Sequence, residues 1–105
     1  MKTLTLLDQG LLLGIIRLRP TAYGVNLREE IAKRGGRAYS FGAIYEALSR
    51  LERAGFVTRS VGEPTQERGG RAKTYFDITA AGGMALSESL RATDALRAGL
   101  GGLAA

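Results

Sequence analysis

The sequence contains no cysteine, no histidine and no tryptophan among its 105 residues. Without cysteine, the chain can form neither disulfide bonds nor thiolate metal sites. Because histidine is absent as well, a transition-metal site would need carboxylates alone, which suit zinc and copper poorly. A serine or cysteine nucleophile would also lack its usual histidine base. These absences argue against an enzyme, and we expect no cofactor.

Long apolar runs are lacking too. The stretch from Leu4 to Leu18 is rich in leucine and isoleucine, but Asp8, Gln9, Arg17 and two glycines interrupt it. A membrane-spanning helix needs about 20 predominantly apolar residues, so this stretch is too short and too punctuated. The single Lys2 and the lack of a small-residue cleavage site argue against a signal peptide. We therefore expect a cytoplasmic protein with no membrane partner.

The composition is ordinary for one folded domain, with 45% hydrophobic and 24% charged residues. A chain of this length builds one modest core, which a partner subunit would help to stabilise. The formal net charge is +5. A basic balance on a small domain is typical of a protein that binds a polyanion, usually nucleic acid. Charge alone is equally compatible with simple solubility.

Apolar periodicity predicts three helices in the first half of the chain. The first ends at Arg19–Pro20, and its apolar residues lie three or four apart: Leu4, Leu7, Leu11, Ile15 and Leu18. The second covers about 22–34, Gly35–Gly36 stops it, and its buried ridge comprises Tyr23, Leu27 and Ile31. The third follows a capping Ser40 and reaches about Ala54, with an inward face of Ile44, Leu48 and Leu51.

The second half begins with two β-rich runs, 56–61 and 73–78, joined by turn formers that predict a hairpin with a long tip. Thr79 can cap a last helix over about 80–99. The predicted fold class is mostly α with a small β-hairpin, in the order of a winged helix-turn-helix followed by a C-terminal helix. We assign residues 1–79 to the winged domain and 80–105 to a dimerisation helix in the same compact unit.

The distribution of charge agrees with this layout in part. In a winged helix-turn-helix, the third helix enters the major groove and the hairpin lies against the flanking backbone. Residues 59–73 and 22–37 each carry a net charge of +2, whereas residues 42–54 are neutral. Because phosphate contacts dominate affinity, we expect double-stranded DNA as the partner. The neutral third helix keeps an alternative open, a winged-helix protein-interaction or architectural module that reads no DNA sequence.

Four segments resemble a known family. Residues 41–57, FGAIYEALSRLERAGFV, resemble the third-helix signature of the PadR family of bacterial transcriptional regulators, in which Gly-x-x-Tyr precedes a Leu-x-x-Leu-Glu-x-x-Gly run. Residues 69–82, GGRAKTYFDITAAG, resemble its wing, while Tyr23–Gly24 and the LLLGII run at 11–16 resemble its first two helices. The length fits the short subgroup with a single C-terminal helix. We therefore expect a homodimeric repressor that binds a pseudo-palindromic operator.

The predicted DNA contacts lie in two segments. In and before the third helix they are Ser40, Phe41, Gly42, Ala43, Tyr45, Ser49 and Arg50, and in the wing they are Arg71 and Lys73. The resemblance implies that Tyr45 touches the DNA backbone, where its hydroxyl could donate to a phosphate; partial burial under the wing is the alternative. Gly42 and Ala43 are small enough for a close approach, and Ser49, Arg50 and Arg53 could reach base edges or phosphates, unless the arginines are merely solvated.

The last helix carries a stripe of leucines. We predict that Leu86, Leu90, Leu96 and Leu100, spaced nearly as in a coiled-coil seam, meet the same helix of a second subunit. Packing onto the first helix of the same domain is the alternative. The resemblance also implies a small-molecule effector, since short members sense flat aromatic compounds near these helices. With no tryptophan and no aromatic residue after Ala80, we expect a smaller apolar effector with a cationic or hydrogen-bonding end, or no pocket.

Overall fold

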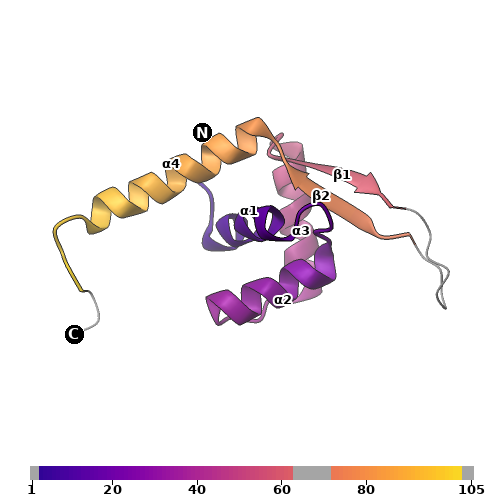
Figure 1. Ribbon diagram of the computed structural model, residues 1–105, viewed down its shortest axis with the longest axis horizontal. Coiled ribbons are helices and arrows are strands. Elements are labelled where there is room, and N and C mark those ends of the chain that lie inside the picture. The colour runs from indigo at the N-terminus through magenta and orange to yellow at the C-terminus, as the bar shows by residue number, and fades with distance from the viewer. Residues whose placement is uncertain (1–2, 63–71, 103–105) are drawn as a thin grey trace.

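The computed structural model describes residues 3–62 and 72–102. Its elements, in chain order, are α1 (Leu6–Leu18), α2 (Gly24–Gly35), α3 (Phe41–Arg53), β1 (Val57–Val61), β2 (Thr74–Ile78) and α4 (Ala80–Arg97) (Figure 1). The two strands form an antiparallel hairpin in which Val57 pairs with Ile78 and Val61 with Thr74. The predicted fold class is confirmed.

Two helices begin at the predicted caps. The Ser40 hydroxyl accepts a hydrogen bond from the Ala43 N–H at 3.1 Å at the start of α3. The Thr79 hydroxyl accepts from the Gly82 N–H at 3.0 Å at the start of α4. Each bond satisfies one backbone donor that the first turn of a helix leaves without a partner. Side-chain chemistry visible in the sequence therefore sets both starting points.

The first helix starts two residues later than the periodicity predicts. Thr5 has an extended backbone and caps α1, because its hydroxyl accepts from the Asp8 N–H while the Asp8 carboxylate accepts from the Thr5 N–H, both at 3.0 Å. This reciprocal capping box fixes Leu6 as the first helical residue. Leu4 nevertheless remains buried in the core, which explains why its spacing fits the apolar stripe.

The second helix is bounded by local backbone geometry at both ends. The Tyr23 N–H donates to the Asn26 side chain at 2.8 Å, so α2 begins at Gly24 and not at the predicted Ala22. Gly36 ends it in the left-handed conformation, with φ of 73°. Only glycine adopts this conformation readily, so the predicted glycine stop is confirmed.

One hydrophobic core joins the three helices, the base of the hairpin and the first turns of α4. Its largest fully buried side chains are Leu11, Leu12, Ile15, Leu27, Ile44, Leu48 and Val57. Leu86 belongs to the same core and is only 4% exposed. This corrects the prediction that Leu86 lies in the dimer seam, because its side chain is already buried in the core of its own chain.

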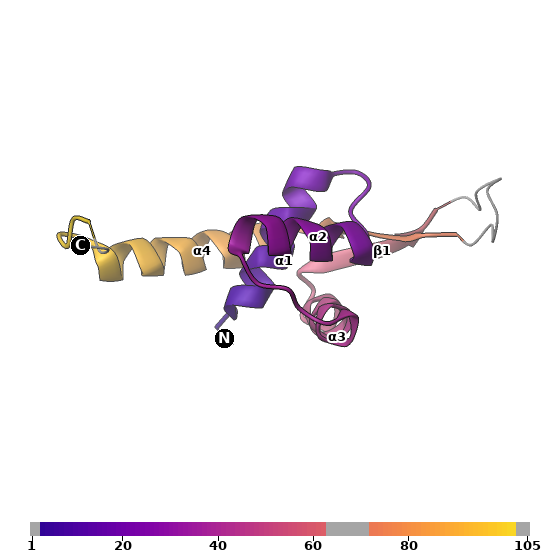
Figure 2. The ribbon, with the colours of Figure 1, turned by 90° about the horizontal axis from the view of Figure 1, so that it is seen from below.

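The molecule is elongated, with principal extents of 54 × 30 × 21 Å. α4 projects from one side of the helical body and the hairpin projects from the opposite side (Figures 1 and 2). Every residue from Arg91 to Gly102 is exposed, including Leu96 at 83%. Within the part of the chain described, no helix combines the length and the apolar character that crossing a membrane requires.

Candidate nucleic-acid interface

The exposed part of α3 is its N-terminal outer face. Ile44, Leu48 and Leu51 point into the core, as predicted. On the other side of the helix, Phe41, Gly42, Tyr45 and Glu46 are exposed, while Ala43 and Ser49 are half-buried. Figure 2 shows α3 protruding from one side of the molecule. A helix that is anchored along one face and open at its N-terminal end has the form needed to enter a DNA groove.

Tyr45 lies against the start of α2. Its ring stacks on Phe41 with centroids 6.4 Å apart, and it is 47% exposed. A Cβ atom on Gly24 would overlap the Tyr45 hydroxyl and ring, so a larger residue at position 24 would force the Tyr45 side chain to shift. The partial burial of Tyr45 thus comes from α2, whereas the sequence suggested the wing as its cover.

Arg28 of α2 completes this side of the surface. Its guanidinium lies 4.4 Å from the centroid of the Phe41 ring, and its Nε donates to the Tyr39 carbonyl at 2.6 Å. The side chain therefore ties α2 to the segment that leads into α3. Sequence reasoning did not single out Arg28, because the helix pattern gives it only as one of several charged residues on the wet face of α2.

The base of the wing meets the same region. The Lys73 ammonium lies 4.4 Å from the centroid of the Tyr23 ring, which packs edge-on against Tyr75 at 6.0 Å. Tyr23 directly precedes Gly24, the residue that touches Tyr45. Two predicted contacts from distant segments, Tyr45 and Lys73, therefore border the same end of α2. The predicted contact Arg71 lies outside the described residues.

Two ion pairs brace the hairpin. Arg59 of β1 pairs with Glu52 of α3 at 2.9 Å, and Arg19 beyond α1 pairs with Asp77 of β2 at 2.7 Å. The hydrogen bond from Arg19 lowers the pKa of the Asp77 carboxyl below its ordinary value. Each guanidinium is about half-exposed and lies beside its carboxylate partner. We expect Arg59 and Arg19 to orient the wing.

The two arginines of α3 differ in their ion-pair partners. Arg53 is exposed and makes no ion pair within residues 3–62 and 72–102. Arg50, in contrast, turns toward α1 and bonds the Asp8 carboxylate at 2.6 Å. Of the two arginines, only Arg53 therefore points its charge away from the domain.

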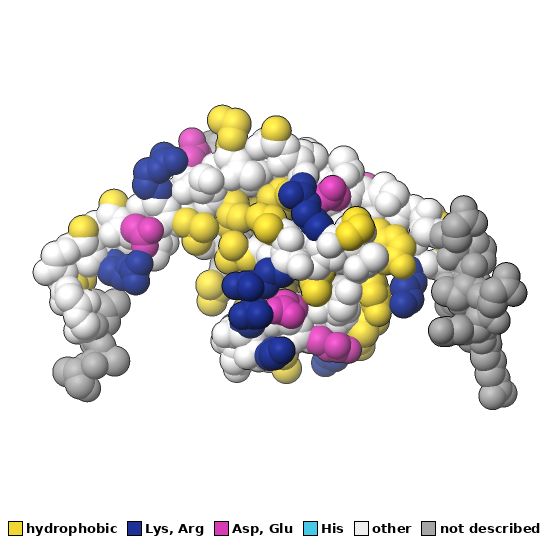
Figure 3. All heavy atoms as spheres, in the orientation of Figure 1, with side chains coloured by type: hydrophobic (Ala, Val, Ile, Leu, Met, Phe, Trp, Pro, Cys, Tyr) yellow, Lys and Arg dark blue, Asp and Glu magenta, His cyan; other side chains and the backbone are white. Residues whose placement is uncertain are grey.

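A groove lies between α1 and α2, on the side where α4 leaves the domain. Its volume is about 430 Å³, and its lining includes Leu13, Ile31, Tyr39 and Leu90 together with Arg17 and Arg37. Figure 3 shows hydrophobic side chains where α4 meets the helical body, with Lys and Arg side chains close by. The rim of the groove carries three arginines and one acid, Glu30, whereas the sequence suggested an effector with a cationic or hydrogen-bonding end. Within the described residues, no cluster of acidic side chains could hold a metal ion.

Comparison with known proteins agrees with this geometry. The sequence matches the Transcriptional regulator PadR-like family over residues 12–88. A PadR family transcriptional regulator from Eggerthella lenta is 26% identical, with a TM-score of 0.67 over 90% of this chain and 82% of that one. No curated protein sequence is significantly similar.

Two further solved structures share the fold at lower identity. A transcriptional regulator from Clostridium thermocellum is 20% identical, with a TM-score of 0.75 over 94% of this chain and 90% of that one. A PadR family transcription regulator from Clostridium difficile is 19% identical, with a TM-score of 0.73 over 93% of this chain and all of the other.

Proposed function

Since the chain belongs to the PadR-like family and is a DNA-binding transcriptional regulator, not an enzyme, we propose that it acts as a homodimeric repressor on a pseudo-palindromic operator. The observation that carries this proposal is the exposed N-terminal face of α3, bordered by the start of α2 and by Lys73 of the wing. This arrangement offers one element for the groove and basic groups for the phosphates on either side.

The proposed contacts follow from the position of each side chain. Gly42 and Ala43 let the end of α3 approach the base edges closely, and Ser40 holds that end in place by accepting from the Ala43 N–H. The Tyr45 hydroxyl donates to a phosphate, and Phe41 supports its ring. Ser49 and Arg53, farther along the helix, are placed to reach bases or backbone.

The wing supplies the charge that α3 lacks. Within α3, Glu46 and Glu52 balance Arg50 and Arg53. Lys73, and with it Arg71, adds positive charge where a wing follows the flanking backbone. The wing therefore contributes affinity and α3 contributes discrimination.

Dimerisation is proposed from the distal half of α4. Leu90 and Leu96 are exposed there, Leu100 is exposed beyond the end of the helix at Arg97, and α4 continues past the core that holds Leu86. Exposed leucines repeated along one helix are stabilised when a second copy covers them. Two copies would also present two α3 helices to the two half-sites of a palindrome.

The groove between α1 and α2 is the proposed effector site. Its volume of about 430 Å³ lies within the roughly 300–1,000 Å³ of typical small-molecule sites. The floor is apolar and the rim carries three arginines against one acid, Glu30, so the groove favours a small apolar molecule with one anionic end. Tyr39 is the one aromatic residue in the lining, so planar multi-ring compounds should bind poorly.

A binding titration tests the central proposal. The purified protein is titrated against the DNA upstream of its own gene and against a scrambled duplex of equal length and composition. A sequence-specific repressor should prefer the promoter fragment by about a thousandfold or more. The control variant Lys73→Ala should weaken binding to both duplexes and reduce the salt slope by about one.

Equal affinity for the two duplexes would instead favour the second candidate, a winged-helix architectural or protein-interaction module. The neutral charge of α3 is the observation that supports this candidate. Because base readout and phosphate binding are separate contributions, the scrambled duplex distinguishes the two functions.

A further inference from the structure

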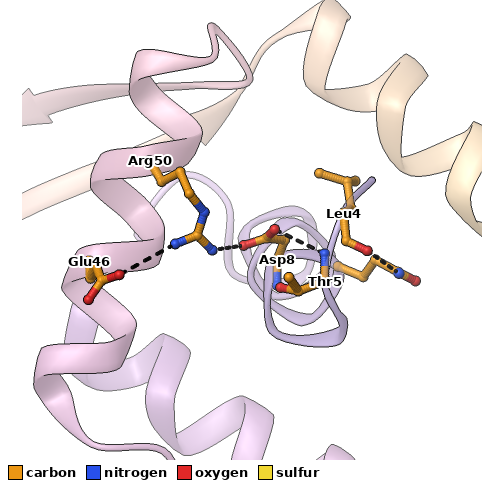
Figure 4. Close-up of polar contacts among 6 residues, drawn as sticks. Leu4, Thr5, Asp8, Glu46 and Arg50 are labelled. Carbon is orange, nitrogen blue, oxygen red and sulfur yellow. Dashed lines mark hydrogen bonds and ion pairs between the residues drawn. The ribbon is translucent and has the colours of Figure 1, made fainter. Parts of the chain in front are cut away.

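A buried acid on α1 has no part in the proposed DNA surface. Asp8 is 4% exposed and is the only buried charged residue in the part of the chain described. One of its carboxylate oxygens accepts from the Thr5 N–H at 3.0 Å, and the other accepts from the Arg50 guanidinium at 2.6 Å (Figure 4). The first bond is local to the start of α1. The second reaches across to α3.

This ion pair differs from the others in its burial. The pairs at Arg19–Asp77 and Arg59–Glu52 have both partners substantially exposed, whereas the Asp8 side chain is 5% exposed. A buried carboxylate without a charged partner would cost much more free energy than an exposed one. Arg50 is therefore held to Asp8 more firmly than a surface arginine is held to a surface acid.

The Asp8–Arg50 ion pair also supplies a directional contact between α1 and α3, which the apolar core does not. The two helices also pack together, and buried aliphatic side chains of both, such as Leu11 and Leu48, belong to the shared core. Hydrophobic burial is non-directional, so aliphatic contacts alone specify the helix rotation weakly. A charge-assisted hydrogen bond requires a defined distance and angle. It therefore restricts the rotation of α3 further than the apolar stripe does.

We propose that the Asp8–Arg50 ion pair positions α3 for DNA binding, and that Arg50 is a positioning residue and not a DNA contact. The inference rests on the proposed function. Arg50 follows Ser49 directly and lies one turn from Glu46, so a rotation of α3 would move every proposed contact on this helix. The sequence alone suggested a DNA contact, because an arginine on the third helix of a winged domain usually faces outward.

Two matched variants give opposite expectations. Asp8→Asn removes the charge but retains an oxygen that can accept from the Thr5 N–H. Glu46→Gln removes one charge from a carboxylate that is 80% exposed and lies 3.9 Å from Arg50. If Arg50 contacted DNA, both substitutions would free its guanidinium and raise affinity for any duplex.

A positioning role predicts a different pattern. Asp8→Asn should weaken binding roughly two- to thirtyfold, while Glu46→Gln should strengthen it slightly. The titrations use the promoter fragment and the scrambled duplex, at a temperature where circular dichroism shows each variant folded. Binding by Asp8→Asn that equals or exceeds that of the native chain would overturn the proposal.

Substitution of Arg50 provides the second measurement, which also applies if Asp8→Asn does not fold. With a positioning role, Arg50→Gln should lower affinity without changing the salt slope, whereas loss of a phosphate contact should reduce the slope by about one. Arg50→Lys keeps the charge but not the guanidinium geometry, so it should also weaken binding at an unchanged slope. A reduced slope for Arg50→Gln would refute the inference. Failure of the native chain to prefer the promoter fragment would refute only sequence-specific function.

Discussion

The winged domain and the distal half of α4 are stabilised in different ways. In the domain, α1, α2, α3 and the hairpin bury one shared set of aliphatic side chains. In α4 beyond Leu90, every residue is exposed, including Leu96 at 83%. Leucine side chains are therefore buried within the chain in the winged domain and exposed in the distal half of α4. Exposed leucines on a helix that extends beyond the core of its own domain are the surface that the proposed dimer would cover.

The largest expected effect concerns the winged domain, whose core is complete within one chain. Leu48 is fully buried on the inner face of α3. Leu48→Ala should lower the free energy of unfolding by about 2–5 kcal/mol, because it removes buried surface and leaves a cavity. Urea denaturation followed by circular dichroism measures the loss. Leu96→Ala serves as the control and should change the free energy of unfolding little when the protein is diluted to the monomer. Equal losses of stability for the two variants would contradict the difference between the two regions.

The next prediction tests whether a partner covers the distal half of α4. Leu96→Glu should give monomers, since each leucine withdrawn from an interface forfeits about 1.5–3 kcal/mol of transfer free energy. Operator affinity should fall with the dimer, because two half-sites require two copies. Sedimentation of the variant and of the native protein at micromolar concentration provides the measurement.

The control for this experiment is Ala95→Glu, which places the same charge beside the leucine stripe and should leave the dimer intact. Leu90→Glu should act like Leu96→Glu but with some loss of stability, because Leu90 also lines the groove beside α1. A native protein that sediments as a monomer at micromolar concentration would contradict the proposed dimer.

A smaller effect concerns the surface of the winged domain itself. If the Tyr45 hydroxyl donates to a phosphate, Tyr45→Phe should cost roughly 0.5–1.5 kcal/mol of DNA-binding free energy without changing the fold. Fluorescence anisotropy with the promoter fragment measures this cost. Tyr39→Phe, a matched change in the groove, should bind DNA as the native chain does. Identical affinities for all three proteins would exclude the Tyr45 contact.

The smallest expected effect lies at the junction of α1 and the wing. Arg19 lowers the pKa of Asp77 from its ordinary value of 3.8, so the pair stabilises the folded state above that value. This stabilisation is lost as the pH falls through the lower folded-state pKa. Asp77→Asn should therefore reduce the decline in thermal stability below about pH 4. Melting curves at pH 7 and pH 3 measure it, and an unchanged acid dependence would show that the pair contributes nothing.

Local patterns in the sequence predicted most of the fold. The spacing of Ile44, Leu48 and Leu51 identified the buried face of α3, and Ser40, Thr79 and Gly36 marked helix boundaries. Such signals depend on neighbours within one or two turns, so no distant contact is needed to interpret them. The start of α1 differs from the periodicity because the reciprocal bonds between Thr5 and Asp8 make Leu6, and not Leu4, the first helical residue.

The sequence predicted which residues belong to the candidate site, but not which other residues they contact in the fold. The sequence identified Tyr45 and Lys73 separately, yet their common neighbour at the start of α2 depends on how three helices and a hairpin cross. It gave Arg50 an outward role, because nothing in local spacing connects it to an acid 42 residues earlier. It also assigned Leu86 to a partner, although the core of its own chain already buries it. Periodicity identifies the face on which a side chain lies, but only the tertiary structure determines which charge or surface that face meets.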